Sequence, residues 1–224
     1  MPDDGDAAPG SADDRKAIVA AGYDALGPRF DDWRARVIDP THDRLLATFE
    51  AELPPGSVVL DLGCGPGVPT TARLAARFRV TGVNISGSQL DAARRNVPAA
   101  TFIHADFGSL RLPRGSFDGV VAMYSIVHLP RDEHAGLLDR IASWLRPGGL
   151  LLATLGAHDD PGWTGPWLGE PMFFSSFDAA TNRSLVERAG LELEVADVVD
   201  VLEPEGPVPF LWVLARRGAR VSRS

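Results

Sequence analysis

The sequence predicts an α/β fold built on a mostly parallel β-sheet. After Ser57, short apolar runs alternate with amphipathic helical patterns, which is typical of parallel strands covered by helices on both faces. Near the end of the chain, two long strand-like runs are joined by the short turn at 203–206, and such a turn requires antiparallel neighbours. We therefore expect a seven-stranded sheet that ends in an antiparallel hairpin.

The composition favours one globular domain. The 224 residues are 45% apolar, which is enough for a sizeable core. The formal charge is −8, but five aspartates lie in the first 14 residues, and the rest of the chain carries 25 acidic against 22 basic side chains. The basic residues are scattered, so the sequence disfavours nucleic acid as a partner.

The sequence gives no sign of export or of a membrane partner. Cys64 is the single cysteine, and the N-terminal stretch has neither a basic nor an apolar region, so we expect a cytoplasmic protein. No uninterrupted apolar run approaches the roughly 18 residues of a membrane span.

The N-terminal part is expected to be a helical cap. Residues 1–14 are rich in Asp, Ala, Gly and Pro and lack periodicity, so we expect a disordered acidic tail. Over 15–52, apolar residues recur at helical spacing, with breaks at Gly27–Pro28 and Asp39–Pro40; this predicts several helices. The rest of the chain is divided into the main α/β domain and a short tail, at 53–216 and 217–224.

The periodicity also places the elements of the main domain. Strands are expected at 58–62, 80–84, 101–104, 117–123, 149–155, 191–202 and 208–215. Helices are expected at 69–77, 87–95, 131–145 and 178–189.

Residues 156–177 interrupt this alternation. The segment is dense in Gly and Pro, yet it holds six aromatic or methionine side chains. A loop of that length inside a compact domain is usually functional, so we expect an inserted lid over a binding site. The alternative is a satellite hydrophobic cluster beneath a loop.

Three glycines at alternate positions follow the first expected strand. Gly63, Gly65 and Gly67 would let a ligand contact main-chain atoms at the carboxyl edge of the sheet. A dinucleotide fold requires G-x-G-x-x-G, whereas this register is G-x-G-x-G after Asp61, and Thr70 stands where a third glycine of that pattern would fall. The loop therefore disfavours a nicotinamide-dependent oxidoreductase.

The stretch DLGCGPG resembles motif I of the class I S-adenosylmethionine-dependent methyltransferases. Four further stretches resemble later motifs of this family, in the family's order: VTGVNIS, HADF, FDGVVAMYSIVHL and LRPGGLLLATL. The resemblance covers about 53–216 and is of the small-molecule type found in the methyltransferase-11 and -25 domain families. It implies a Rossmann-like fold and S-adenosyl-L-methionine as the cofactor, with S-adenosyl-L-homocysteine as the product.

The same resemblance implies roles in cofactor binding. Asp61 is expected to attract the amino group of the cofactor, while Gly63 and Gly65 let its methionine part lie against the backbone. The alternative for Asp61 is a carboxylate that only fixes its own turn. The residues expected to bind the cofactor are Asp61, Gly63, Cys64, Gly65, Gly67, Asn84, Ile85, Asp106, Phe107 and Met123.

The adenosine half is expected beside the second and third strands. Ile85 would pack on adenine, Asp106 would accept a hydrogen bond from its amino group, and the Phe107 amide would serve a ring nitrogen. A solvated loop is the alternative for Asp106. Where the family usually has an acidic residue for the ribose, this chain has Asn84, whose amide lacks a second acceptor oxygen. That replacement should cost about 1 kcal/mol, so we predict that Asn84→Asp binds the cofactor more tightly.

Two residues in the loop after the fourth strand are candidates for catalysis. An oxygen nucleophile needs a base, and His128 is the best-placed imidazole, while Tyr124 could orient the substrate. The alternative for His128 is to pack this loop against the next helix. Cys64 has no visible base partner and is interpreted as a small loop residue, and the pair at 159–160 does not define a metal site.

The acceptor pocket is expected between the N-terminal helices and the lid, because both adjoin the carboxyl edge of the sheet. Its expected walls are Tyr23, Phe30, Trp33, Trp163, Trp167 and Phe174. Such an enclosure favours a small organic acceptor, methylated at O, N or C by in-line displacement. Two alternatives remain: a protein of this fold that binds S-adenosylmethionine for cyclisation or sensing, to which only Asn84 points, and a purely structural interaction protein.

Overall fold

The computed structural model describes residues 10–218. The strands are β1 (Val58–Leu62), β2 (Arg79–Asn84), β3 (Thr101–His104), β4 (Phe117–Ala122), β5 (Leu145–Gly156), β6 (Asp160–Trp167), β7 (Glu170–Ser176), β8 (Leu191–Glu203) and β9 (Gly206–Arg217). The helices are α1 (Ala12–Leu26), α2 (Pro28–Arg34), α3 (Pro40–Glu52), α4 (Thr70–Ala75), α5 (Gly87–Asn96), α6 (His134–Trp144) and α7 (Ala179–Arg188). Short 3-10 turns lie at Ile126–His128 and Arg131–Glu133. None of the helices in this part of the chain has the length and apolar character needed to cross a bilayer.

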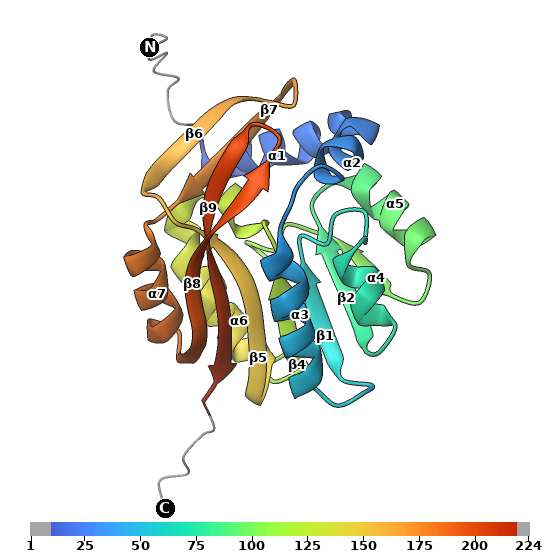
Figure 1. The fold of residues 1–224 in the computed structure, drawn as a ribbon, viewed down its shortest axis with the longest axis vertical. Helices are drawn as coiled ribbons and strands as arrows, with labels where there is room; N and C mark the ends of the chain where they lie inside the picture. Colours follow the sequence, from blue (N-terminus) through green and yellow to red (C-terminus); the bar gives the residue numbers. More distant parts are fainter. Residues whose placement is uncertain (1–9, 219–224) are drawn as a thin grey trace, which may run out of the picture.

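The described strands form one large sheet and one hairpin. The large sheet has seven strands in the order β3-β2-β1-β4-β5-β9-β8 (Figure 1). Neighbours from β3 to β5 are parallel, whereas β9 runs antiparallel to both β5 and β8. The expected Rossmann-like, mostly parallel sheet with an antiparallel C-terminal hairpin is confirmed.

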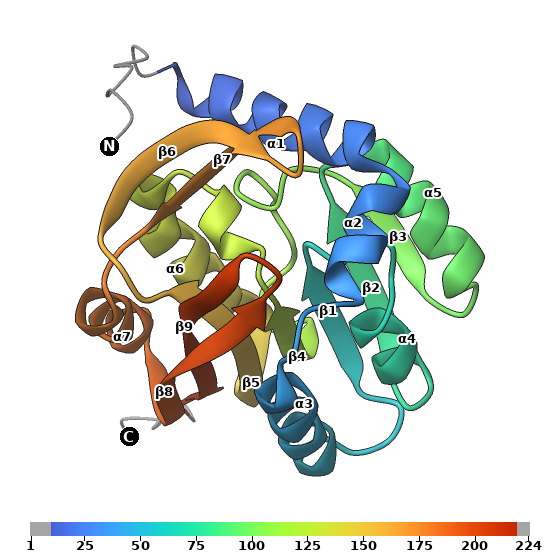
Figure 2. The ribbon, with the colours of Figure 1, turned by 45° about the horizontal axis from the view of Figure 1, so that its top comes forward.

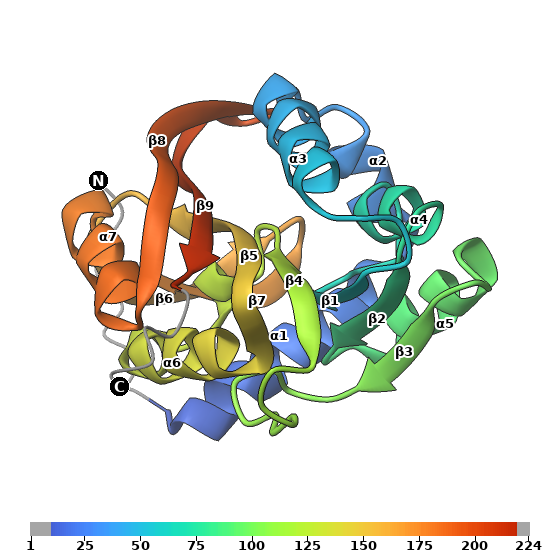
Figure 3. The ribbon, with the colours of Figure 1, turned by 90° about the horizontal axis from the view of Figure 1, so that it is seen from below.

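Both faces of the large sheet are covered by helices. On β1, Leu60 joins the apolar layer beneath α6 and α7, while its neighbour Val59 joins the layer beneath α3 and α4. Figure 3 shows these two helix pairs on opposite sides of the sheet. Helix α5 packs along β2 and β3 at the edge. Burial on both faces explains why the parallel strands are continuous apolar runs in the sequence.

Helix α1 begins at Ala12, before the expected boundary at residue 15. The hydroxyl of Ser11 accepts a hydrogen bond from the Asp14 backbone at 3.2 Å, and the Asp14 carboxylate accepts one from the Ser11 backbone at 2.9 Å. This reciprocal capping satisfies N–H groups that the first turn of a helix leaves unpaired. Residues 12–14 are therefore helical, and their assignment to the tail was wrong.

The breaks expected within the helical cap lie where the prolines indicate. Pro28 and Pro40 are the first residues of α2 and α3, where a missing N–H costs nothing. At the other end, Arg217 still belongs to β9 rather than to the expected tail. The rest of both expected tails, at 1–9 and 219–224, falls outside the described residues.

The segment 156–177, expected as a loop, contains the hairpin of β6 and β7. Pairing continues to Trp167 and Glu170, which leaves Leu168 and Gly169 as a two-residue turn with φ angles of 51° and 86°. Positive φ at both positions matches the twist of the flanking strands. The pair Leu-Gly lacks the usual Asn-Gly or Asp-Gly signal, so the pattern did not predict the hairpin. Figure 2 shows it lying along α1.

The β8–β9 hairpin continues beyond the carboxyl edge of the sheet. The last residue of β5, Gly156, pairs with Phe210, whereas β8 and β9 remain paired to Glu203. The projecting end is held by a bridge between Ile38, before α3, and Leu202. This part, residues 200–209, is called the β8–β9 overhang below.

Candidate functional site

A cavity with a volume of about 640 Å³ lies at the carboxyl edge of the parallel strands. Its walls come from the ends of β1, β2 and β4, from α1 and α2, from the β6–β7 hairpin and from the β8–β9 overhang. Ligands of open α/β sheets bind in this position, and ligand sites typically measure about 300–1,000 Å³. The cavity is therefore the candidate site.

Most residues predicted from the sequence lie on this wall. They are Tyr23, Phe30, Trp33, Asp61, Gly63, Cys64, Gly65, Asn84, Ile85, Phe107, Met123, Tyr124, His128, Trp167 and Phe174. Gly67, Asp106 and Trp163 do not line the cavity.

The three glycines of the loop after β1 have different reasons to be glycine. A Cβ at Gly65 would meet no atom closer than 3.9 Å, so the protein leaves open space beside this residue that a side chain would partly fill. At Gly63, a Cβ would lie 2.3 Å from that of Ser125, and at Gly67 it would lie 3.0 Å from a methyl group of Val97. Close packing within the protein thus adds to the positive φ angles that favour glycine at Gly63 and Gly67, and ligand contact at Gly67, which does not line the cavity, stays a prediction.

Asp106 is committed to a contact within the protein. Its carboxylate accepts a hydrogen bond from the Lys16 ammonium at 3.0 Å and another from the Gly108 backbone at 2.7 Å. Lys16 also pairs with Glu133 at 2.7 Å. Neither alternative weighed from the sequence describes this arrangement, because the ion pair holds α1 against the loop after β3.

Trp163 is 45% exposed and lies away from the expected pocket. In the hairpin, β7 packs on α1, whereas the exposed residues of β6 face solvent. The ring of Trp163 contacts Phe174 at a centroid distance of 6.0 Å. It therefore covers the outside of a cavity residue instead of forming the wall.

Asp61, at the end of β1, is a buried carboxylate without a basic partner in the described part of the chain. It is 2% exposed, and its Oδ2 accepts a hydrogen bond of 2.6 Å from the Thr71 hydroxyl on α4. Burial raises the pKa of Asp61 to about 6, although the Thr71 hydrogen bond opposes the shift. A cationic group in the cavity would remove this penalty.

Asn84, at the end of β2, belongs to a network that ties α1 to the start of α5. Its Oδ1 accepts a hydrogen bond of 2.9 Å from the Ser86 backbone, while its amide NH₂ group has no partner among the described residues. The Ser86 hydroxyl donates to Asp24 of α1, which also accepts from the Ser88 backbone at 3.0 Å. The side chain thus offers donors, not acceptors, to the cavity.

His128 is held by two partners from distant elements. Its Nδ1 lies 3.0 Å from the carbonyl oxygen of Phe173 on β7, and its Nε2 lies 2.8 Å from the hydroxyl of Tyr23 on α1. A carbonyl can only accept, so Nδ1 carries the hydrogen and the Nε2 lone pair accepts the Tyr23 O–H. Burial lowers the pKa of His128 to about 4, which keeps the ring neutral near pH 7.

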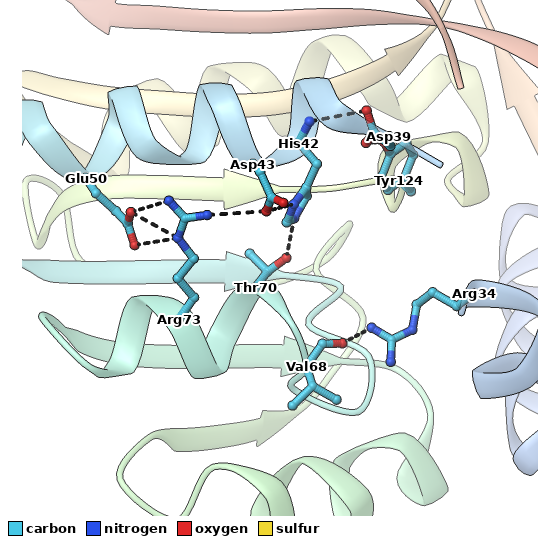
Figure 4. Close-up of polar contacts among 9 residues, drawn as sticks. All are labelled: Arg34, Asp39, His42, Asp43, Glu50, Val68, Thr70, Arg73 and Tyr124. Carbon is cyan, nitrogen blue, oxygen red and sulfur yellow. Dashed lines mark hydrogen bonds and ion pairs between the residues drawn. The ribbon is translucent and has the colours of Figure 1, made fainter. Parts of the chain in front are cut away.

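The hydroxyl of Tyr124 is already engaged. It donates to the carboxylate of Asp39, which caps α3 by accepting from the His42 backbone at 3.2 Å. Figure 4 shows this contact together with the imidazole of His42, which lies 2.9 Å from the Thr70 hydroxyl on α4. Burial and the Asp39 carboxylate raise the pKa of Tyr124. The hydrogen bond from the Tyr124 hydroxyl therefore anchors the loop after β4 to the start of α3.

The β8–β9 overhang contributes cavity residues that sequence reasoning missed. They are Val201, Glu203, Val208 and Pro209, and the adjoining Phe210 of β9 also lines the cavity. The available signal was the length of the expected strand at 191–202, which exceeds that of the strand expected at 149–155. Length alone does not reveal on which side a hairpin projects.

Comparisons with known proteins agree with this geometry. A family model described as a methyltransferase domain matches residues 59–149. The O-methyltransferase cnsE of Penicillium expansum is 34% identical over 202 residues, which cover 83% of this chain and 70% of the relative. A trans-aconitate 2-methyltransferase of Methylobacterium radiotolerans is 32% identical over 203 residues, which cover 84% of this chain and 70% of the relative.

Solved structures share the fold. The 1,6-didemethyltoxoflavin-N1-methyltransferase of Burkholderia thailandensis, with bound 1,6-didemethyltoxoflavin and S-adenosylhomocysteine, has a TM-score of 0.72 at 22% identity, covering 95% of this chain and 93% of that chain. The [4+2]-cyclase SpnF has a TM-score of 0.60 at 21% identity, covering 79% of this chain and 81% of that chain. At these identities, the likeness concerns the fold alone.

Proposed function

Because the chain belongs to the class I S-adenosylmethionine-dependent methyltransferases, we propose that it methylates a small organic acceptor held between α1, the β6–β7 hairpin and the β8–β9 overhang. The observation that carries this proposal is the junction of two kinds of wall in one cavity. The buried Asp61 and the open backbone at Gly65 form one end, and an aromatic chamber with the Tyr23–His128 pair forms the other.

The residues at the first end fit the cofactor. The Asp61 carboxylate would hold the amino group, and the backbone at Gly65 leaves space for the methionine part. The buried Oε1 of Gln89 has no hydrogen-bond partner in the described residues and lies 3.9 Å from the Cβ position of Gly65. The Asn84 amide and the Ile85 side chain would hold the adenosine part. When bound, S-adenosylmethionine supplies an activated methyl group that needs only an aligned nucleophile.

The residues at the second end can accept a proton from an acceptor hydroxyl. Tyr23 donates its own hydrogen to Nε2 of His128, so lone pairs on its oxygen are free to accept a hydrogen bond from the acceptor. As the acceptor oxygen bonds to the methyl carbon, its proton passes to Tyr23, and the Tyr23 proton passes to His128. The carbonyl of Phe173 keeps the imidazole in the required tautomer.

The aromatic walls would exclude water from this reaction. Trp167 at the end of β6 contacts Trp33 at a centroid distance of 5.1 Å and Tyr23 at 6.0 Å. We infer that the β6–β7 hairpin acts as the cover predicted for 156–177, because it places Trp167 and Phe174 on the wall of the same cavity. A dry enclosure strengthens the electrostatic contacts within it.

Several relatives are named after trans-aconitate, and the cavity of this chain does not match the charge of that compound. Trans-aconitate carries three carboxylates, which would call for basic side chains. Arg34 is the only Lys or Arg among the described residues of the cavity wall, and we therefore propose a neutral or cationic acceptor.

Two measurements test the proposal. S-adenosylhomocysteine should raise the melting temperature of the full chain, and methyl-labelled S-adenosylmethionine should label a member of a small-molecule panel. Asp61→Asn should abolish the thermal shift, whereas Asp91→Asn, on the exposed face of α5, should not. Absence of any shift with the unmodified chain would overturn the proposal, and binding without labelling across the panel would favour the non-methylating alternative.

A further inference from the structure

The charged side chains on the cavity wall are mostly acidic. Among the described residues, the acidic members are Asp39, Asp43, Asp61, Asp160 and Glu203. A wall of this kind repels anionic acceptors, but each carboxylate has to be considered with its partners, because an engaged acid does not attract a ligand.

Three of these acids already have protein partners. Asp39 accepts the hydroxyl hydrogen of Tyr124. Asp43 forms an ion pair of 3.3 Å with Arg73. Asp160 accepts a hydrogen bond of 2.9 Å from the backbone two residues later. Asp61 is the group proposed above for the cofactor, so Glu203 is the acid left for an acceptor.

The single guanidinium on the wall is also engaged. Arg34 donates through one terminal nitrogen to the carbonyl of Val68, as Figure 4 shows, and its other terminal nitrogen lies 3.5 Å from the Asp31 carboxylate. Its Nε is buried and has no hydrogen-bond partner among the described residues. Arg34 therefore keeps one unpaired donor, but it is a single cation against five acidic side chains on the described wall.

Glu203 lines the same cavity as the Tyr23–His128 pair. It is the last residue of β8 in the overhang, and its side chain has no hydrogen-bond or ion-pair partner among the described residues. Glu203, Tyr23 and His128 all line this cavity, and after burial the negative charge of Glu203 contributes to the raised pKa of Tyr23. Burial and the neighbouring Glu205 raise the pKa of Glu203 to about 7, a cost that a cation would remove.

An aromatic cluster lines the same cavity as Glu203. Trp33 stacks with Phe30 at a centroid distance of 6.3 Å and meets Trp167 edge-on at 5.1 Å. Its Nε1 donates a hydrogen bond of 2.9 Å to Glu205, which fixes the cluster to the turn of the overhang. An aromatic wall and a carboxylate within one cavity are the chemistry that recognises alkylammonium groups.

We propose that the acceptor carries a cationic nitrogen, which Glu203 binds against the aromatic wall of Tyr23, Trp33 and Trp167. The proposal rests on the proposed function and names its acceptor class. Glu203 would act as a specificity residue, because it selects the acceptor by charge and leaves the methyl transfer to the cofactor and the Tyr23–His128 pair.

The test uses matched acceptors in the presence of saturating S-adenosylhomocysteine. Aromatic compounds of one skeleton, each as amine, alcohol and carboxylic acid, are ranked by calorimetry against the full chain, Glu203→Gln and Glu203→Lys. We expect the amines to bind best, Glu203→Gln to weaken them about tenfold without affecting the alcohols, and Glu203→Lys to favour the acids. Glu194→Gln, an exposed change on the same strand, should leave the ranking unchanged.

The outcomes separate this inference from the proposed function. Unchanged affinity for S-adenosylhomocysteine in each variant shows that the cofactor end is folded. Amines that bind no better than alcohols or acids, or an amine affinity that Glu203→Gln does not reduce, would overturn the role of Glu203 while leaving the methyltransferase intact. Failure of the unmodified chain to bind S-adenosylhomocysteine would instead contradict the proposed function.

Discussion

The hydroxyl of Tyr23 lies 2.8 Å from Nε2 of His128, although 105 residues separate them in the sequence. The other ring nitrogen lies 3.0 Å from the carbonyl of Phe173, so α1, the turn after β4 and the β6–β7 hairpin meet at one imidazole. The tautomer of a neutral His is set by the hydrogen bond that its other nitrogen makes. The basic nitrogen therefore faces the cavity only when the hairpin is in place.

His128→Gln should lower kcat by about 10²–10⁴-fold and leave the affinity for S-adenosylhomocysteine unchanged. Tyr23→Phe should also lower kcat, because the proton path loses its first group. His134→Gln is the matched control: this histidine is 1% exposed, its Nε2 lies 2.9 Å from the Leu129 carbonyl, and it lies outside the cavity wall. An equal loss of kcat in the control would assign the effect to folding.

Asp61→Asn should stabilise the unliganded protein while abolishing cofactor binding. The folded-state pKa of Asp61 is raised to about 6 from 3.8, so the folded protein binds the proton more tightly and loses stability as pH rises from about 4 through 6. The penalty above that window is about 3 kcal/mol, and the amide can still accept from Thr71. Urea unfolding should show a higher free energy of unfolding for Asp61→Asn than for the parent at pH 8, and no difference at pH 4. A variant less stable than the parent at pH 8 would contradict this account.

Asn84→Asp should bind S-adenosylmethionine several-fold more tightly, by about 1 kcal/mol. One carboxylate oxygen would keep the Ser86 backbone bond of 2.9 Å, and the other would replace the NH₂ group, which we propose to face the ribose. The Asp24 carboxylate, which shares Ser86 as a partner, would oppose the new charge. Calorimetry should show a larger gain when Asp24→Asn is added, and equal or weaker binding in both backgrounds would refute this view of the ribose site.

Gly22→Ala should loosen the roof of the cavity. A Cβ at Gly22 would lie 2.6 Å from the Pro171 carbonyl and 2.9 Å from Met172, so α1 and β7 would have to separate. We expect a loss of about 1–3 kcal/mol in the free energy of unfolding and a raised KM for the acceptor.

Gly136→Ala is the matched control for that change. A Cβ at Gly136 in α6 would meet only the end of the Arg140 side chain at 3.4 Å, and alanine favours a helix by about 1 kcal/mol over glycine. Urea unfolding should show that Gly136→Ala has a higher free energy of unfolding than the parent. A Gly22→Ala protein as stable as the parent would contradict this prediction, because it would mean that the β6–β7 hairpin can move away from α1 without loss of stability.

The parallel strands and the glycine loop were predictable because their signals are local. A strand buried on both faces is a nearly continuous apolar run, as β1 is at Val58–Leu62 apart from Asp61, and its expected and observed bounds agree. The capping box at Ser11 was also readable from the sequence but was overlooked. The hairpin after β5 was not, since Leu168 adopts a positive φ that its side chain does not favour.

By itself, the sequence determined the fold class, the family and the position of the cofactor loop, because local periodicity and a fixed register of small residues specify them. Only the tertiary structure decided which side chains share the cavity. It paired Tyr23 with His128, paired Asp106 with Lys16, and brought Glu203 to the cavity wall. These relationships depend on how separate elements pack against one another, and no pattern within one element contains the distance or direction between two.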